Sequence, residues 1–499
     1  MTRAQRVVLV VSILGSFVAF LDASVVNVAL PAIRNDLGGG ISAQQWIVDA
    51  YLVTLGSFIL LAGSLSDLFG RKRVFAAGLV GFGATSLLAA TAPGATILIV
   101  ARGLQGMTGA LLVPSSLAMI IANFTGPDQG KAIGTWTAWT GISFIIGPLL
   151  GGALVDLGSW RWVFAINVVP IGATLAVLAR IPREPAHAER SHVDLPGAIL
   201  CALGLGGVIF GLIEAPIHGW RAPAIYLPLA GGAAAFAGFL IYERFAPHPM
   251  VDFALFRNRN FAMGNAATAA IYAGLSAFTF LLTVFLQQVA DYRATAAGLA
   301  LLPVTLLMWA LSPVAGRLAG KYGPRWFMTF GPLLGAAGFL MMLRVNARTA
   351  YFTEMLPGML VFGIGLSFTV SPLTAAVLGS IDQRHAGIGS AINNAIARVA
   401  GLLAVAAVGA VVAAQYSAAL GAADTGSLSA PARAFVTVAQ ERPLDTSVPK
   451  SLGNDRPAVK AALDGASVRA LHAGLWSMAV ALAAGGMISA AGIRNPKPT

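Results

Sequence analysis

Charged side chains are scarce in this sequence. They make up 10% of its 499 residues, whereas soluble proteins carry about 25%. A chain of this length would then have too little polar surface to stay in solution, which excludes a soluble enzyme and a disordered chain. With 57% hydrophobic residues, the composition predicts an integral membrane protein.

The sequence contains a single cysteine, Cys201, so an intrachain disulfide is excluded, and its place in an apolar run indicates a packing role. It contains no His, Cys, Asp and Glu cluster with metal-ligand spacing, no GxxxxGK[ST] phosphate-binding loop and no serine nucleophile elbow. We therefore expect no metal, no cofactor and no ATP-driven or enzymatic chemistry. A membrane enzyme is the least favoured function.

Lys and Arg outnumber Asp and Glu by 32 to 20. The basic residues lie mainly in loops on the side of both chain ends, which is the distribution described by the positive-inside rule. This predicts a multi-pass protein of the cell (inner) membrane with both termini cytoplasmic. It also argues against nucleic acid as a partner; the expected surroundings are membrane lipids.

Fourteen apolar runs approach the length of about 20 residues that a helix needs to cross a bilayer. They cover approximately residues 7–30, 45–65, 74–91, 96–121, 132–155, 162–180, 195–215, 223–243, 260–287, 296–315, 327–345, 353–378, 387–414 and 470–492. The expected fold is all-α, with fourteen transmembrane helices arranged as two pseudo-symmetric six-helix bundles and two intervening helices.

A weak internal repeat supports this division. GSLSDLFGRKR (63–73) follows the second run, and GRLAGKYGPR (316–325) follows the tenth, which is the equivalent loop if the two bundles are repeats. Parallel repeats mark transporters that rock about a central site. The predicted parts are a bundle at 1–180, two additional spans with flanking cytoplasmic loops at 181–259, and a bundle at 260–499 with an outer loop at 415–469.

Two ionisable residues lie deep in the first bundle. Asp22 in the first span and Arg102 in the fourth are expected at similar depth, because the two spans run in opposite directions. A central Asp costs roughly 2.5–3.5 kcal/mol to insert, so protonation or a paired cation must compensate. Both residues are candidates for proton coupling; the alternative is structural, with each side chain bonded to neighbouring helices.

Other polar residues within spans are candidates for coupling or for lining a substrate cavity. Asp49, one turn into the second span, is a third proton-coupling candidate, although a merely interfacial position is the alternative. Gln105 lies one turn after Arg102 on the same helix face. The expected cavity residues are Asn27, Tyr51, Gln105, Asn394 and Arg398.

Glycine and proline are concentrated in two places. The fifth span contains GPLLGG, in which a kink at Pro148 and close helix approach at Gly147, Gly151 and Gly152 predict a hinge. The loop at 63–73 predicts a cytoplasmic latch made of Gly63, Asp67, Gly70 and Arg71. The alternatives are generic tight packing for the first and a topology signal for the second.

These motifs resemble the major facilitator superfamily and, within it, the fourteen-span drug:proton antiporters. The resemblance rests on LDASVVNVALP (21–31), GSLSDLFGRKR (63–73), RGLQGMTGA (102–110), GPLLGG (147–152) and WRWVFAINVVPIG (160–172), in that order along the chain. It implies proton-coupled export, with Asp22 as the proton or cation site and Arg102 as the coupling residue. It also implies that Asp67 and Arg71 form the latch and that Pro148 with its glycines forms the antiport hinge.

The expected function is therefore multidrug efflux of hydrophobic, cationic small molecules by alternating access, in exchange for protons. One alternative is a dedicated exporter of one endogenous metabolite, such as an antibiotic, a siderophore or a lipid precursor. A second is a non-transporting sensor on the same fold.

Overall fold

The structure, a computed structural model, describes residues 1–124, 126–180, 194–247, 249, 251, 253–381, 386–424, 426 and 428–495. Within these ranges the chain forms helices joined by turns, with no β-strand. The first helix begins at a capping box, in which the hydroxyl of Thr2 accepts from the backbone N–H of Gln5 at 3.2 Å and the Gln5 side chain accepts from Thr2 N at 2.8 Å.

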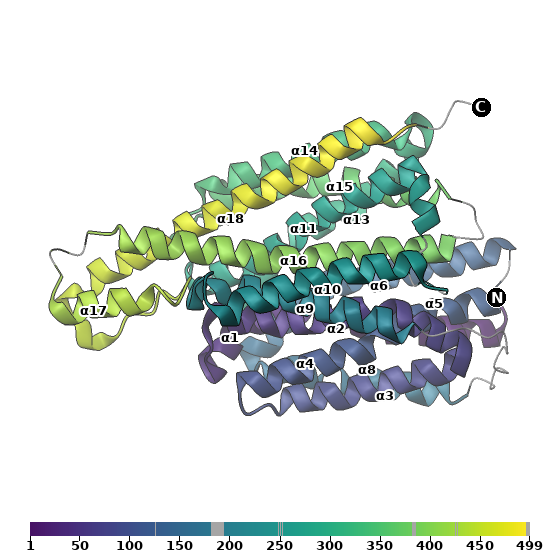
Figure 1. The fold of residues 1–499 in the computed structure, drawn as a ribbon, viewed down its shortest axis with the longest axis horizontal. Helices are drawn as coiled ribbons and strands as arrows, with labels where there is room; N and C mark the ends of the chain where they lie inside the picture. Colours follow the sequence, from purple (N-terminus) through teal and green to yellow (C-terminus); the bar gives the residue numbers. More distant parts are fainter. Residues whose placement is uncertain are drawn as a thin grey trace.

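Two lobes pack side by side, with two further helices beside them (Figure 1). The N-terminal lobe consists of α1 (Arg3–Leu37), α2 (Gly40–Phe69), α3 (Arg71–Ala90), α4 (Ala95–Ala110), α5 (Leu112–Asn123), α6 (Gly126–Leu157), α7 (Arg161–Ala165) and α8 (Val168–Leu178). The C-terminal lobe consists of α11 (Arg259–Gln288), α12 (Ala294–Ala300), α13 (Leu302–Tyr322), α14 (Pro324–Met341), α15 (Leu356–Leu378), α16 (Ala386–Gly421), α17 (Ala430–Ala439) and α18 (Arg456–Gly492).

The two further helices, α9 (Leu195–His218) and α10 (Pro223–Phe245), form a hairpin. Glycines let them approach closely, since a Cβ on Gly207 would lie 2.8 Å from the Cα of Gly232. The α9 helix packs against α2 of one lobe and α16 of the other. The hairpin therefore borders the junction between the lobes.

Twelve helices among the described residues are long and apolar enough to cross a membrane. They match twelve of the fourteen predicted runs. The two other runs correspond to α2 and α6, helices of 30 and 32 residues that are not among the twelve. Large apolar side chains remain exposed on the bundle, for example Trp309 at 72% and Phe245 at 76%, as a lipid-facing surface requires.

The predicted outer loop at 415–469 is shorter than expected. The α16 helix continues to Gly421, α18 already begins at Arg456, and α17 lies between them. This extension buries apolar residues such as Leu428, Val436 and Leu463 in the same core as the C-terminal lobe, which is why it is structured. In Figure 1 this extension projects from one end of the bundle, which we call the α17 end. The start of α1 and the end of α18 lie at the opposite end, which we call the terminal end.

The two halves of the internal repeat turn in the same way. Gly70 ends α2 and begins α3 with φ 91° and ψ 131°, and Gly323 ends α13 and begins α14 with φ 86° and ψ 150°. These positive φ values favour glycine. The similar spacing in 63–73 and 316–325 therefore encodes one tight helix–helix turn twice.

The lobes are joined at the α17 end. The side chain of Gln287 donates to the carbonyl of Val28 at 2.9 Å, and that of Gln45 donates to the carbonyl of Val405 at 3.0 Å. Arg34 bonds Gln288 at 2.8 Å and forms an ion pair with Asp445 at 3.2 Å. Among the described residues, the hydrogen bonds between the lobes all lie at this end, so the bundle is closed there.

Candidate functional site

Asp22 and Arg102 form an ion pair inside the N-terminal lobe. Arg102 Nη1 lies 2.5 Å from Asp22 Oδ2, and the two side chains are 0% exposed for Asp22 and 2% for Arg102. Asp22 comes from α1 and Arg102 from α4. The pairing compensates two charges that would each be costly alone in a low-dielectric interior.

Polar side chains complete the coordination of this pair. Asp22 Oδ1 accepts from Gln105 Nε2 at 3.0 Å and from Asn167 Nδ2 at 2.8 Å, while both amides also bond the hydroxyl of Ser86, at 2.8 and 3.3 Å. Arg102 further donates to Gln105 Oε1 at 2.6 Å and to the carbonyl of Ile47 at 3.0 Å. With donors on both oxygens, Asp22 is arranged as an anion.

Asn167 and Ser86 are functional candidates that the sequence analysis did not identify. Asn167 lies within WRWVFAINVVPIG, and both residues are fully buried. A buried amide in an apolar helix requires a hydrogen-bond partner, which is a signal that the sequence carried. The identity of that partner, Asp22, depends on helix packing.

The structure differs from the predicted cavity at Gln105 and Tyr51. Both are buried, with exposed fractions of 0% and 1%, and both surround the ion pair. The Arg102 guanidinium carbon lies 4.2 Å from the centroid of the Tyr51 ring, and Tyr51 OH donates to the carbonyl of Ala19 at 3.2 Å. These two residues therefore shape the charge cluster.

Asp49 lies elsewhere, at the junction of three helices. On α2 it is flanked by Gln45, which bonds Val405 of α16, and by Trp46, whose indole N–H donates to Glu214 of α9 at 3.0 Å. Helix geometry places Asp49 on the same side as both. It is fully buried, and neither carboxyl oxygen accepts a hydrogen bond from the described residues.

Of the remaining predicted cavity residues, two lie on one face of α16. Arg398 is partly exposed and Asn394, one turn earlier, is exposed. The guanidinium carbon of Arg398 lies 5.5 Å from the ring centroid of Phe20 on α1, across the junction between the lobes. Asn27 lies two turns after Phe20 on the same face of α1 and is partly buried.

The GPLLGG segment brings α6 into close contact with two other helices. A Cβ on Gly151 would lie 2.6 Å from Val25 of α1, and one on Gly147 would overlap Ser24. A Cβ on Gly152 would lie 2.6 Å from the backbone nitrogen of Thr295, in α12 of the other lobe. Asp156 accepts from the same nitrogen at 3.0 Å. The segment with Pro148 thus belongs to the closed α17 end.

Gly152→Val is expected to prevent this closed arrangement, because its side chain would occupy the position of the Thr295 backbone. We predict at least tenfold slower transport, measured as dye efflux from cells expressing equal amounts of protein. Gly172→Val on α8 is the matched control, because a Cβ there meets nothing within 4 Å. Equal rates for the two variants would contradict a role of this contact.

Only part of the predicted latch lies within the residues that the structure describes. Gly70 makes the turn between α2 and α3, and Arg71 begins α3. The surroundings of Gly63 and the side chain of Asp67 lie outside the described part of the structure. The latch therefore stays a prediction.

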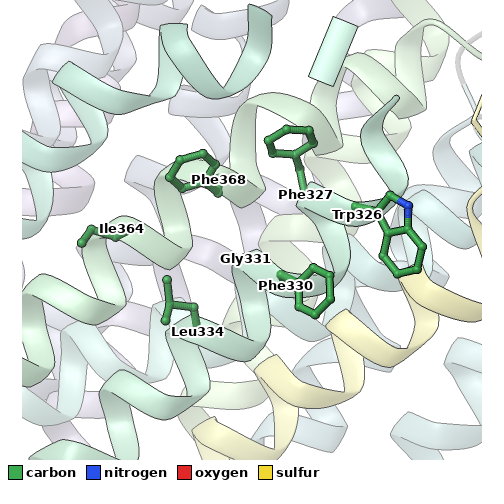
Figure 2. A pocket seen from close by; sticks show the side chains of 7 residues that line it. All are labelled: Trp326, Phe327, Phe330, Gly331, Leu334, Ile364 and Phe368. Atoms are coloured by element: carbon green, nitrogen blue, oxygen red, sulfur yellow. The ribbon is translucent and has the colours of Figure 1, made fainter. Parts of the chain in front are cut away.

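A hollow of about 280 Å³ lies on the C-terminal lobe between α14 and α15. Figure 2 shows its lining of Trp326, Phe327, Phe330, Gly331, Leu334, Ile364 and Phe368. It offers no ionisable side chain, so it cannot hold a proton or pair with a charge. Its exposed aromatic residues suit contact with lipid.

Comparisons with known proteins agree with this architecture. A family model described as Major Facilitator Superfamily matches residues 12–405. The chain is 33% identical to the multidrug resistance protein Stp of Mycobacterium tuberculosis over 84% of this chain and 78% of that protein. It is 33% identical to the puromycin resistance protein pur8 of Streptomyces alboniger, covering 80% of each. The cephamycin export protein CmcT of Amycolatopsis lactamdurans is 33% identical over 79% of this chain and 82% of that protein.

Solved structures share the fold at low sequence identity. A bacterial homologue of the human lysosomal transporter Spinster, in an inward-facing and unoccupied conformation, superimposes with a TM-score of 0.69 at 14% identity, covering 98% of both chains. A mutant of the nucleoside transporter NupG gives a TM-score of 0.63 at 12% identity, with 97% of this chain and 99% of that one covered.

Proposed function

The chain belongs to the Major Facilitator Superfamily, and we propose that it is a proton-coupled exporter of hydrophobic small molecules. Membership makes it a multi-pass membrane transporter rather than an enzyme. The observation that supports proton coupling is the buried Asp22–Arg102 ion pair. An ionisable pair held out of water between two helices is a device that a proton can switch.

We propose fourteen spans, with α2 and α6 added to the twelve apolar helices. The basic loops then place both termini in the cytoplasm, and the α17 end faces outward. Residues 1–180 and 260–499 act as the two rocking lobes, and 181–259 contributes the α9–α10 hairpin. In this orientation the closed end is the outer one, so the structure represents an inward-facing state.

Protonation of Asp22 is the proposed switching step. The charge-assisted bond to Arg102 exists only while Asp22 is ionised. A proton on Asp22 removes this bond and loosens α1 against α4. Since α1 also carries the contacts of Val28 and Arg34 with the other lobe, the change reaches the outer closure directly.

We further propose that Asp49 carries a proton in the inward-facing state. A fully buried carboxylate without donors or a cation would cost several kcal/mol, so the neutral acid is the stable form at the junction of α2, α9 and α16. The two carboxyl groups then hold opposite protonation states in one conformation.

Asp49→Asn tests this assignment. Infrared difference spectroscopy of the purified protein should show the carbonyl band of a protonated carboxyl in the wild type and its loss in Asp49→Asn, with an unchanged melting temperature. Asp36→Asn is the control, because Asp36 is an exposed partner of Arg161 and ionised, so its removal leaves the band in place. An identical band in Asp49→Asn would show that the protonated carboxyl is not Asp49 and would overturn the assignment.

The driving force is sufficient for one proton per cycle. A charge that crosses the membrane gains about 2.3 kcal/mol per 100 mV. At roughly 150–200 mV this supports a concentration ratio on the order of 10²–10³. The proposed latch (Gly63, Asp67, Gly70, Arg71) and hinge (Gly147, Pro148, Gly151, Gly152) would gate the cytoplasmic and outer ends of this cycle.

Multidrug efflux is supported by the names of relatives such as the multidrug resistance protein Stp. A dedicated exporter is the second candidate, because other relatives are named for one antibiotic each, puromycin and cephamycin. Among the described residues, Arg398 is the charged side chain that is accessible between the lobes. Because it is a cation, we do not propose the cationic cargo that the sequence led us to expect.

The proposed function is tested with inverted membrane vesicles. Dye uptake of ethidium and of carboxyfluorescein should require the proton gradient and stop when an uncoupler is added. Uptake that continues with the uncoupler present would exclude proton coupling. Binding of a dye without any flux would favour a sensor on the same fold.

A further inference from the structure

We infer that Arg398 anchors an acidic group of the transported compound, so that this exporter accepts amphipathic organic anions. The inference rests on the proposed function and adds a substrate class to it. The chemistry concerned is a carboxylate or sulfonate on an aromatic or otherwise apolar body.

Arg398 lies where the lobes separate. Along the face of α16 turned to the N-terminal lobe, Val405 and Leu402 are buried with 2% and 0% exposure, Arg398 is partly exposed and Asn394 is exposed. The lobes therefore meet from Val405, at the bond from Gln45, to Val399, whose side chain would lie 3.8 Å from a Cβ on Gly56. Beyond this contact the side chains on this face become exposed towards the terminal end, and Arg398 lies at the boundary, with Phe20 facing it.

The charge of Arg398 has no counterion in the part of the chain that the structure describes. Among these residues no carboxylate forms an ion pair with it and nothing accepts a hydrogen bond from it. Its titratable neighbours are the phenols of Tyr51 and Tyr272, which are uncharged at neutral pH. Asp22, the nearest acid along α1 to Phe20, is bonded to Arg102 and fully buried.

Such a cation is costly within a membrane span and indicates a ligand that completes it. Arginine presents a planar fork of N–H donors that matches a carboxylate, a sulfonate or a phosphate, and it keeps its charge at every working pH. The Phe20 ring makes the surroundings of Arg398 apolar on the side of α1, which suits an acid carried on an apolar body. A cationic compound would be repelled at this position.

The local preference for anions can be measured without knowing the natural compound. In a Cys201→Ser background, which removes the only cysteine, Asn394→Cys places a thiol one turn from Arg398. The measured quantity is the ratio of the labelling rate with the anionic reagent, methanethiosulfonate ethylsulfonate, to the rate with the cationic trimethylammonium reagent. We expect this ratio to be about tenfold higher with Arg398 present than with Arg398→Gln. Arg398→Lys should keep the preference. Equal ratios with and without Arg398, or no labelling by either reagent, would overturn the inference.

Transport gives the second measurement, with the vesicle assay of the proposed function. Arg398→Gln should slow proton-driven uptake of carboxyfluorescein at least tenfold but should not slow that of ethidium, because the substitution removes a charge that repels cations; the melting temperature should stay unchanged. Equal uptake of carboxyfluorescein by wild type and variant, or wild-type uptake of ethidium alone, would overturn the inference and leave the proposed function intact. If the wild type moves neither dye, the proposed function fails, and the labelling ratio still decides whether Arg398 attracts anions.

Discussion

We expect Asp22→Asn to abolish concentrative efflux while the protein remains folded. The amide cannot take up or release a proton, so an accumulation ratio on the order of 10²–10³ should fall to one. The fold should survive because Arg102 keeps the side chain of Gln105, the carbonyl of Ile47 and the Tyr51 ring as partners. The loss of the ion pair should cost about 3–5 kcal/mol, because Arg102 is left as a buried charge without its counterion.

The measurement is the pH-gradient-dependent uptake of dye by inverted vesicles, with protein amount and melting temperature determined in parallel. Asp36→Asn is the matched control, since it makes the same change on the same helix at an exposed ion pair. Normal gradient-driven uptake by Asp22→Asn would remove Asp22 from the coupling mechanism.

Arg102→Gln should uncouple the transporter in a different way. Without its cation, Asp22 keeps only the amide donors of Gln105 and Asn167, and in a low-dielectric interior it would hold a proton throughout the cycle. We therefore expect dye to equilibrate down its own gradient at a measurable rate, with no accumulation against it. The melting temperature should fall, because one partner of a buried ion pair has been removed.

The double variant Asp22→Asn/Arg102→Gln separates coupling from stability. Two neutral amides can bond one another, so the melting temperature should recover above that of Arg102→Gln, by a coupling of roughly 0.5–3 kcal/mol. Concentrative uptake should stay absent. If the effects of the two substitutions on stability simply add, the residues do not act as a pair.

In the proposed mechanism, proton coupling and cargo recognition occupy separate positions. The residues that we propose to respond to protons lie in the core of the N-terminal lobe and at the junction with α9 and α16, whereas Arg398 belongs to the C-terminal lobe. The α1 helix connects them, because it carries Asp22 towards its own lobe and Phe20 towards Arg398. A proton and a compound can thus influence one another through the position of a single helix.

The α17 extension shows where local sequence information was insufficient. Its composition predicted a loop, but the end of α16, the whole of α17 and the start of α18 form helices there. The residues Leu428, Val436 and Leu463 are spaced irregularly along the chain, and only their shared packing with the core of the lobe stabilises the helices.

The sequence by itself determined that this is an all-helical membrane protein of the transporter superfamily, because hydropathy, basic loops and short motifs are local properties summed along the chain. It also identified Asp22 and Arg102, since a charge in an apolar run is visible without a partner. Only the tertiary structure decided how these charges are satisfied. Asn167 lies 145 residues from Asp22, and Gln105, expected at a cavity, is buried beside the ion pair. Whether a polar side chain meets a partner, a neighbouring helix or open space depends on helix rotation and packing, which no local pattern records.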